Sequence, residues 1–165
     1  MKLHVGSGKR RIAGYTNVDA DASVMPDIVA KADSIPLGDG CADEILAVHL
    51  FEHLYRWQCD AVLKEWRRLL KPGGVLTMEL PDLIKCCINL INGATGKTPG
   101  QMDMYGLYGD PTKENPWMCH NWGWSFNTIK PLLEKHGFTE VSESATQWHP
   151  IGKDHRDFRV TARKV

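Results

Sequence analysis

The stretch KLHVGSGKRRIAGYTNVDAD, residues Lys2–Asp21, governs how we interpret the rest of the chain. An apolar strand with Leu3 and Val5 runs into a glycine turn, and a second short strand ends at the acidic residue Asp19. Glycines at the carboxyl end of a strand let the backbone come close to a ligand, because no Cβ stands in the way. A carboxylate at the end of the next strand can accept both hydroxyls of a ribose. This combination predicts a site for a nucleoside-containing cofactor.

The length and charge of the chain indicate one ordinary globular domain. With 165 residues, 42% hydrophobic and 24% charged, the chain can bury its own core, and we expect residues 1–165 to form a single domain. The 20 basic and 20 acidic residues cancel to a formal net charge of zero. Long-range attraction of a nucleic acid is therefore not expected.

Cysteine usage and hydropathy indicate the compartment. The five cysteines are odd in number and contain no C-x-x-C pair, which is typical of free thiols in a reducing environment. No apolar run approaches 18 residues, and the N-terminus enters a strand at once, so we expect neither a membrane span nor a signal peptide. We expect a cytoplasmic protein.

Strands and helices alternate along the remaining sequence. Further strands are expected at Asp27–Ala32, Asp43–Leu50, Val75–Leu80, Thr139–Gln147 and Asp157–Val165, with a turn around His149–Asp154, and helices at Trp57–Leu70, at Leu83–Ile91 and after Ser125 up to Gly137. This order predicts an α/β fold with a mostly parallel sheet of about seven strands and an antiparallel hairpin at one edge. Only about ten residues separate Gly8 from Asp19, too few for a full crossover helix. We therefore expect reduced helix cover in the N-terminal half.

The segment Asn92–Trp124 is rich in glycine, proline and aromatic residues. We expect it to be irregular and to act as a lid over an acceptor, because long loops inside compact domains usually serve binding. Its tryptophans, Trp117, Trp122 and Trp124, either stack on an acceptor or fill a small core beneath the loop. Both interpretations remain open from the sequence.

A series of sequence blocks resembles a known family. VGSG, NVDAD, KADSIPL, DEILAVHLFEHL, LKEWRRLLKPGGVLTMELPDL and LLEKHGF, in this order, are similar to the class I S-adenosylmethionine-dependent methyltransferases, above all to their small stand-alone "type 11" members. The likeness is close over about Leu3–Leu83 and looser over Ser125–Phe138. It implies a Rossmann-like fold, S-adenosylmethionine as the cofactor and methyl transfer as the activity.

The resemblance also implies a cofactor site. Gly6, Ser7 and Gly8 would lie against the methionine part, and Asp19 would hold the ribose. The other positions implied are Asp33 and Ser34 at the adenine, His49 and Leu50 bordering the methyl group and the adenine, and His4 near the amino group. Two departures stand out: His4 replaces the acid or amide of many members, and Lys9-Arg10 replaces the usual third glycine.

Three histidines are candidates for a general base. His49, His53 and His120 could take a proton from an acceptor hydroxyl or amine, if the acceptor must lose one. The letters His49–His53 also spell H-x-x-E-H, a zinc-protease signature that needs a helix. Because ILAVHL is typical of a buried strand, we assign no metal ligand here, although a divalent metal at His49, Glu52 and His53 remains an alternative.

Together these observations predict an S-adenosylmethionine-dependent methyltransferase that acts on a small-molecule or sugar acceptor by in-line displacement. The alternatives are a non-catalytic module that binds S-adenosylmethionine or a nucleoside, a nicotinamide-dependent oxidoreductase and an H-x-x-E-H zinc hydrolase. The oxidoreductase is disfavoured because Arg11 stands where the last glycine of G-x-G-x-x-G belongs. The sequence does not indicate the oligomeric state.

Overall fold

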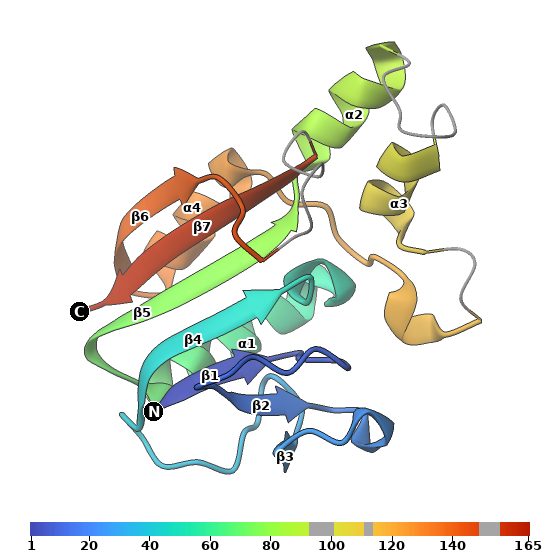
Figure 1. Ribbon diagram of the computed structural model, residues 1–165. Coiled ribbons are helices and arrows are strands. Elements are labelled where there is room, and N and C mark those ends of the chain that lie inside the picture. Colours follow the sequence, from blue (N-terminus) through green and yellow to red (C-terminus); the bar gives the residue numbers. More distant parts are fainter. Residues whose placement is uncertain (93–100, 111–113, 149–155) are drawn as a thin grey trace.

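Seven strands form one sheet in the order β3-β2-β1-β4-β5-β7-β6 (Figure 1). The computed structural model describes residues 1–92, 101–110, 114–148 and 156–165. The strands are β1 (Lys2–Val5), β2 (Thr16–Asp19), β3 (Ile28–Val29), β4 (Ala42–Val48), β5 (Leu70–Pro81), β6 (Phe138–Ser144) and β7 (Asp157–Lys164). The helices are η1 (Ala22–Val24), η2 (Phe51–His53), α1 (Arg56–Leu69), α2 (Leu83–Asn92), α3 (Gln101–Tyr108), η3 (Pro116–Met118) and α4 (Phe126–Lys135).

The directions of the strands confirm the predicted α/β architecture. β3, β2, β1, β4 and β5 are parallel neighbours, whereas β7 pairs antiparallel with both β5 and β6. The chain winds from β1 toward β3 on one side and then resumes at β4 on the other. In such sheets a ligand binds at the carboxyl ends of the strands where the order reverses. Here that point lies between β1 and β4.

One face of the sheet carries the apolar core. α1 and α4 lie on the same side of the sheet in Figure 1 and bury Leu63, Trp66 and Leu133, among others. η2 joins this core through Phe51, whose ring centroid lies 5.8 Å from that of Trp66 and 5.3 Å from that of Trp124. Buried aromatic pairs of this kind fix the turn that follows β4. Trp124 therefore belongs to the core and is not available to an acceptor.

The opposite face is polar. The register places His4 beside Asn17 and Leu46, and it places Glu79 beside Arg159 on the same face. The connection between β1 and β2 spans only residues 6–15 and that between β2 and β3 only residues 20–27, too short for crossover helices. Among the described residues no helix lies on this face in Figure 1, which agrees with the predicted reduced helix cover.

The loop after β6 crosses this polar face. The backbone N–H groups of Gln147 and Trp148 donate to the two carboxylate oxygens of Glu79, at 2.6 and 3.0 Å. The ring of Trp148 meets Tyr15 edge-on, with centroids 6.4 Å apart. The carboxylate of Glu79 thus holds a loop where other proteins of this architecture would place a helix. Residues His149–Asp154, where we predicted a turn, lie outside the described residues.

Several predicted boundaries differ from the structure. β3 is shorter than the strand predicted at Asp27–Ala32, and β5 begins at Leu70, so that it includes the KPGG block. The expectation that Asn92–Trp124 is irregular is wrong in part, because the segment contains α3 and η3. Gly106 lies inside α3, and a glycine within a helix is a reason why the sequence did not predict one there. A Cβ at Gly106 would lie 2.5 Å from Cys86 Sγ, so the glycine serves helix packing.

Candidate active site

The glycine turn and Asp19 meet at one edge of the sheet. Gly6 and Gly8 have positive φ angles of 69° and 51°. The N–H of Gly6 donates to Val18 O at 2.8 Å, and the N–H of Gly8 donates to Asp19 Oδ2 at 2.7 Å. The second carboxylate oxygen of Asp19 accepts the N–H of Asp21 at 2.9 Å. Each carboxylate oxygen keeps a further lone pair, so Asp19 can still accept hydroxyl groups.

Open space lies beside the glycine turn. A Cβ built on Gly8 would meet no atom within 4 Å, so bare backbone borders open space next to the Asp19 carboxylate. Gly6 differs, because a Cβ there would lie 2.8 Å from both terminal carbons of Leu50. Leu50 therefore packs directly on the turn. Leu50, which we predicted to border the cofactor, thus contacts Gly6, one of the residues predicted to lie against its methionine end.

His4 lies on β1, buried on the polar face with only 1% of its surface exposed. Its Nδ1 donates to Asn17 Oδ1 at 3.3 Å, and its Nε2 has no hydrogen-bond partner. Burial lowers the pKa of His4, and the hydrogen bond that His4 donates to Asn17 offsets this only in part. Arg10 lowers the pKa and Asp19 raises it by smaller amounts. His4 is therefore neutral at pH 7.

The neutral state of His4 predicts a pH dependence of stability. Below the ordinary pKa of 6.5 the unfolded chain takes up a proton that folded His4 does not accept, so the free energy of unfolding falls as the pH falls through that window. His4→Gln removes this contribution. Between pH 7.5 and 5.5, urea unfolding should show a larger loss of stability for the wild type than for the variant. Equal losses would contradict the assignment.

Asp33 and Ser34 lie in a turn that follows β3. The N–H of Ser34 donates to Lys31 O at 3.1 Å, and both Asp33 and Ser34 are exposed. This turn lies next to the edge strand β3, on the side of Asp19 that is away from β4. An adenine at this position is compatible with a ribose at Asp19. Their assignment stays a prediction.

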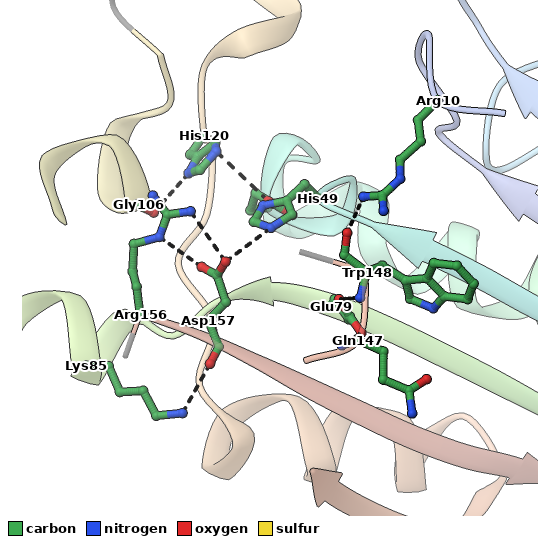
Figure 2. Close-up of polar contacts among 11 residues, drawn as sticks. Arg10, His49, Glu79, Lys85, Gly106, His120, Gln147, Trp148, Arg156 and Asp157 are labelled. Carbon is green, nitrogen blue, oxygen red and sulfur yellow. Dashed lines mark hydrogen bonds and ion pairs between the residues drawn. The ribbon is translucent and has the colours of Figure 1, made fainter. Parts of the chain in front are cut away.

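His49 follows β4 in an unusual conformation. It is not a glycine, yet its φ is 52°, and its N–H donates to Glu79 O at 2.8 Å. Its ring lies between two carboxylates, with Nδ1 2.8 Å from Glu52 Oε1 and Nε2 3.4 Å from Asp157 Oδ2. Figure 2 shows the contact between His49 and Asp157. Backbone strain of this kind gathers at functional sites, where neighbouring contacts maintain it.

The two carboxylates decide the charge of His49. Burial alone would lower the pKa of His49, but the charge of Glu52 and the hydrogen bonds to Asp157 and Glu52 outweigh it and raise the pKa to about 9. His49 is therefore protonated near pH 7. A protonated imidazole donates hydrogen bonds and cannot accept a proton. Of the three predicted base candidates, this leaves His53 and His120.

His120 comes from the segment after α3 and reaches the end of β4. Its Nδ1 donates to Gly106 O at 2.9 Å (Figure 2). Its Nε2 lies 4.0 Å from Glu52 Oε1. The rings of His53 and His120 meet edge-on with centroids 4.7 Å apart. The structure thus brings the three predicted histidines together around Glu52.

Backbone hydrogen bonds hold residues 119–122, which we call the strap, against η2. The N–H groups of Asn121 and Trp122 both donate to Glu52 O, at 2.8 and 3.2 Å. Asn121 Nδ2 donates to His53 O at 2.6 Å, and His53 Nδ1 donates to Cys119 O at 3.0 Å. The H-x-x-E-H letters consequently fall on a strand end and a 3-10 turn, not on the helix that a zinc-protease signature requires.

Two site residues escaped the sequence analysis. Asp157 is fully buried at the start of β7 and faces His49, while Arg156 Nε donates to Asp157 Oδ1 at 2.9 Å. Glu79, also fully buried, carries the loop described above and receives Arg159 Nη1 at 3.0 Å. An acid inside the otherwise apolar strand VLTMEL was the one available signal for Glu79. Asp157 faces His49 only through long-range pairing of β5 with β7.

The basic run Lys9-Arg10-Arg11 has structural partners. Arg10 Nη1 donates to Trp148 O, which ties the glycine loop to the loop after β6 (Figure 2). Arg11 donates to Met25 O at 2.8 Å and pairs with Asp27. These contacts favour a structural role for Arg10 and Arg11 over the phosphate contact that such a run can also make.

Comparisons with known proteins agree with this geometry. Residues 3–78 match the family model of a methyltransferase domain. That stretch, a little less than half of the chain, is similar to a methyltransferase domain. The glycine turn and Asp19 lie within the matched residues. No curated protein matches the chain.

Solved structures of methyltransferases share the fold. An S-adenosylmethionine-dependent methyltransferase from Archaeoglobus fulgidus is 15% identical, with a TM-score of 0.66 over 99% of this chain and 85% of that one. One from Methanosarcina mazei is 17% identical, with a TM-score of 0.67 over 99% and 92%. The 1,6-didemethyltoxoflavin-N1-methyltransferase of Burkholderia thailandensis, with S-adenosylhomocysteine bound, is 18% identical, with a TM-score of 0.64 over 99% and 70%. None of the described helices of the present domain is long and apolar enough to cross a membrane.

Proposed function

We propose that this chain is an S-adenosylmethionine-dependent methyltransferase and that it acts on a small-molecule acceptor bound between the end of β4 and the strap. The observation that supports this most is the convergence of His49, Glu52 and His120 beside Leu50, which packs on Gly6. Polar groups that can engage an acceptor therefore lie next to the predicted methionine end of the donor site. Adjacent donor and acceptor sites are what an in-line methyl transfer requires.

The donor would lie along the carboxyl ends of four neighbouring parallel strands. We assign Gly6, Ser7 and Gly8 to the methionine end and Asp19 to the ribose. The remaining donor-binding residues we assign are His4, Asp33, Ser34 and Leu50. Because the N–H of Gly8 already fixes one Asp19 oxygen, the carboxylate is held in place before the donor arrives.

The protein's own residues would orient the acceptor and shield the reacting atoms from water. S-adenosylmethionine, when bound, supplies a methyl group already activated on a sulfonium, so the protein needs mainly to orient the acceptor and exclude water. Protonated His49, whose two ring nitrogens face Glu52 and Asp157, would place a positive charge near an acceptor oxygen. The strap positions His120 opposite, and Asn92–Trp124 would close over the acceptor as the predicted lid.

The chemistry of the site favours a small acceptor with a hydroxyl, amine or ring nitrogen. Trp117 and Trp122 are 65% and 46% exposed and lie on or beside the strap, where they can stack on a flat ring or a sugar face. The Burkholderia enzyme is by its name an N1-methyltransferase of 1,6-didemethyltoxoflavin, and its structure contains that compound. These observations support a heterocyclic or sugar acceptor for the present chain.

Transfer of a labelled methyl group from S-adenosylmethionine over a panel of sugars, phenols and heterocyclic amines tests this proposal. We expect turnover on at least one class and expect His120→Gln to lower it by about 100-fold or more. His136→Gln is the matched control, since His136 pairs with Asp60 away from the site. Tight donor binding without turnover on any acceptor would instead support the non-catalytic module.

A further inference from the structure

We propose that Glu52, His53 and His120 form a binding site for a divalent cation of the zinc class. One ligand atom from each of the three residues lies within 4.8 Å of the other two. Ligand atoms around a single cation are separated by roughly 3–3.5 Å, given bonds of about 2.0–2.2 Å, so small side-chain rotations would close the set. The residues come from η2 and from the strap.

An unpartnered carboxylate oxygen points to a missing ligand. Glu52 is only 2% exposed, and its Oε2 is buried without a hydrogen-bond partner. Its other oxygen, Oε1, receives His49 Nδ1 at 2.8 Å. Burying a carboxylate oxygen without a partner costs free energy that a bound cation would offset.

The hydrogen bonds of the two histidines leave the correct atoms for a metal. A carbonyl oxygen can only accept, so His53 Nδ1 and His120 Nδ1 carry the protons that they donate to Cys119 O and Gly106 O. In each neutral ring the lone pair is then on Nε2. A histidine that ligates a metal through one nitrogen typically donates its other N–H to a carbonyl or carboxylate, as both rings do here.

The surrounding structure holds these side chains in place. The N–H groups of Asn121 and Trp122 donate to Glu52 O, and Asn121 Nδ2 donates to His53 O. His49 Nδ1 contacts the other oxygen of the Glu52 carboxylate, Oε1, and so helps to orient it. This set differs from the H-x-x-E-H signature, because His120 takes the place of His49, whose Nε2 faces Asp157.

The donor set indicates which cation. Two imidazole nitrogens and one carboxylate oxygen suit Zn²⁺ and its neighbours, whereas Mg²⁺ and Ca²⁺ prefer oxygen ligands. Three protein ligands leave at least one coordination position for an outside oxygen or nitrogen, as in catalytic zinc sites. The use of that position to bind the methyl acceptor rests on the proposed function, whereas cation binding does not.

Titration with Co²⁺ tests the site, because its visible absorption reports the ligands. The full chain with Cys87→Ser and Cys119→Ser provides the background, since both thiols are exposed and would bind the probe. We expect one Co²⁺ per chain, displaced by Zn²⁺. Glu52→Gln and His53→Gln should each weaken binding by at least about 10–100-fold, while the matched control His136→Gln should leave it unchanged.

Two results would overturn the proposal: no stoichiometric Co²⁺ binding by the background protein, or equal binding after Glu52→Gln and His53→Gln. Circular dichroism shows whether each variant folds, and half-buried His53 provides the test if Glu52→Gln does not fold. Titration with S-adenosylhomocysteine is run in parallel. Co²⁺ binding without S-adenosylhomocysteine binding would refute the proposed function and leave the cation site standing.

Discussion

Replacing Gly109 by alanine is expected to destabilise the protein by about 2–3 kcal/mol, close to the upper end for single substitutions. Gly109 has a φ of 88°, and a Cβ there would lie 1.7 Å from the backbone oxygen of Met118. That oxygen cannot move away without breaking the bridge between Gly109 and Cys119, at the start of the strap. The strap would then lose its attachment to the chain after α3, and His120 would leave the site.

Urea unfolding of Gly109→Ala and Gly73→Ala measures this effect. Gly73 has a similar φ of 76°, but a Cβ there would meet nothing within 4 Å, so it isolates the cost of the backbone conformation alone. We expect about 1 kcal/mol for Gly73→Ala. S-adenosylhomocysteine affinity should change little in either folded variant, because Gly109 lies outside the donor site. Equal destabilisation by the two substitutions would show that the strap is not fixed at Gly109.

Replacing Asp19 by alanine is expected to weaken donor binding by roughly 1.5–3 kcal/mol, or about 10- to 150-fold in affinity, the range for losing a charge-assisted hydrogen bond. The variant would lack the hydrogen bonds between the Asp19 carboxylate and the ribose. It would also lack the hydrogen bonds that this carboxylate accepts from the N–H groups of Gly8 and Asp21, at 2.7 and 2.9 Å, so the glycine turn would lose a support. Both effects act in the same direction.

Calorimetric titration with S-adenosylhomocysteine measures the loss, with Asp21→Ala as the matched control. The Asp21 side chain accepts the N–H of Ser23 in η1 at 2.8 Å, and its backbone N–H, which contacts Asp19, remains in the alanine variant. Asp21→Ala should therefore bind the donor as the wild type does. Unchanged affinity in Asp19→Ala would remove Asp19 from the ribose.

The sequence was sufficient for features that depend on local pattern. A strand, a positive-φ glycine turn and an acid after the next strand lie close in the chain, and parallel pairing brings them to one edge, where the N–H of Gly8 meets Asp19. The N-cap Ser125 and the terminating Gly137 similarly marked α4. The short connections between β1, β2 and β3 revealed the face without crossover helices.

The acceptor side could not be predicted to the same depth, because its contacts join distant segments. Glu52 and His120 are 68 residues apart, and backbone bonds between the strap and η2 bring them together. Asp157 reaches His49 only because β7 pairs with β5 in one specific register. His49 was predicted as a base on residue type alone. Its two carboxylate neighbours, which raise its pKa, come from the tertiary structure.

These contacts also explain how a domain with few helices can hold a defined site. Glu79 fixes the loop after β6 on the polar face, and the strap fixes His120 above η2. Buried carboxylates and backbone donors thus replace part of the cover that crossover helices provide elsewhere. This arrangement concentrates ionisable groups at the end of β4, where the proposed acceptor binds.

A crystal structure with S-adenosylhomocysteine bound tests the central claim most directly. We predict that both ribose hydroxyls contact the Asp19 carboxylate, that the methionine end lies against Gly6–Gly8, and that the sulfur faces the space in front of His49 and His120. An adenosine bound elsewhere on the chain, or a donor sulfur directed away from those histidines, would contradict the account.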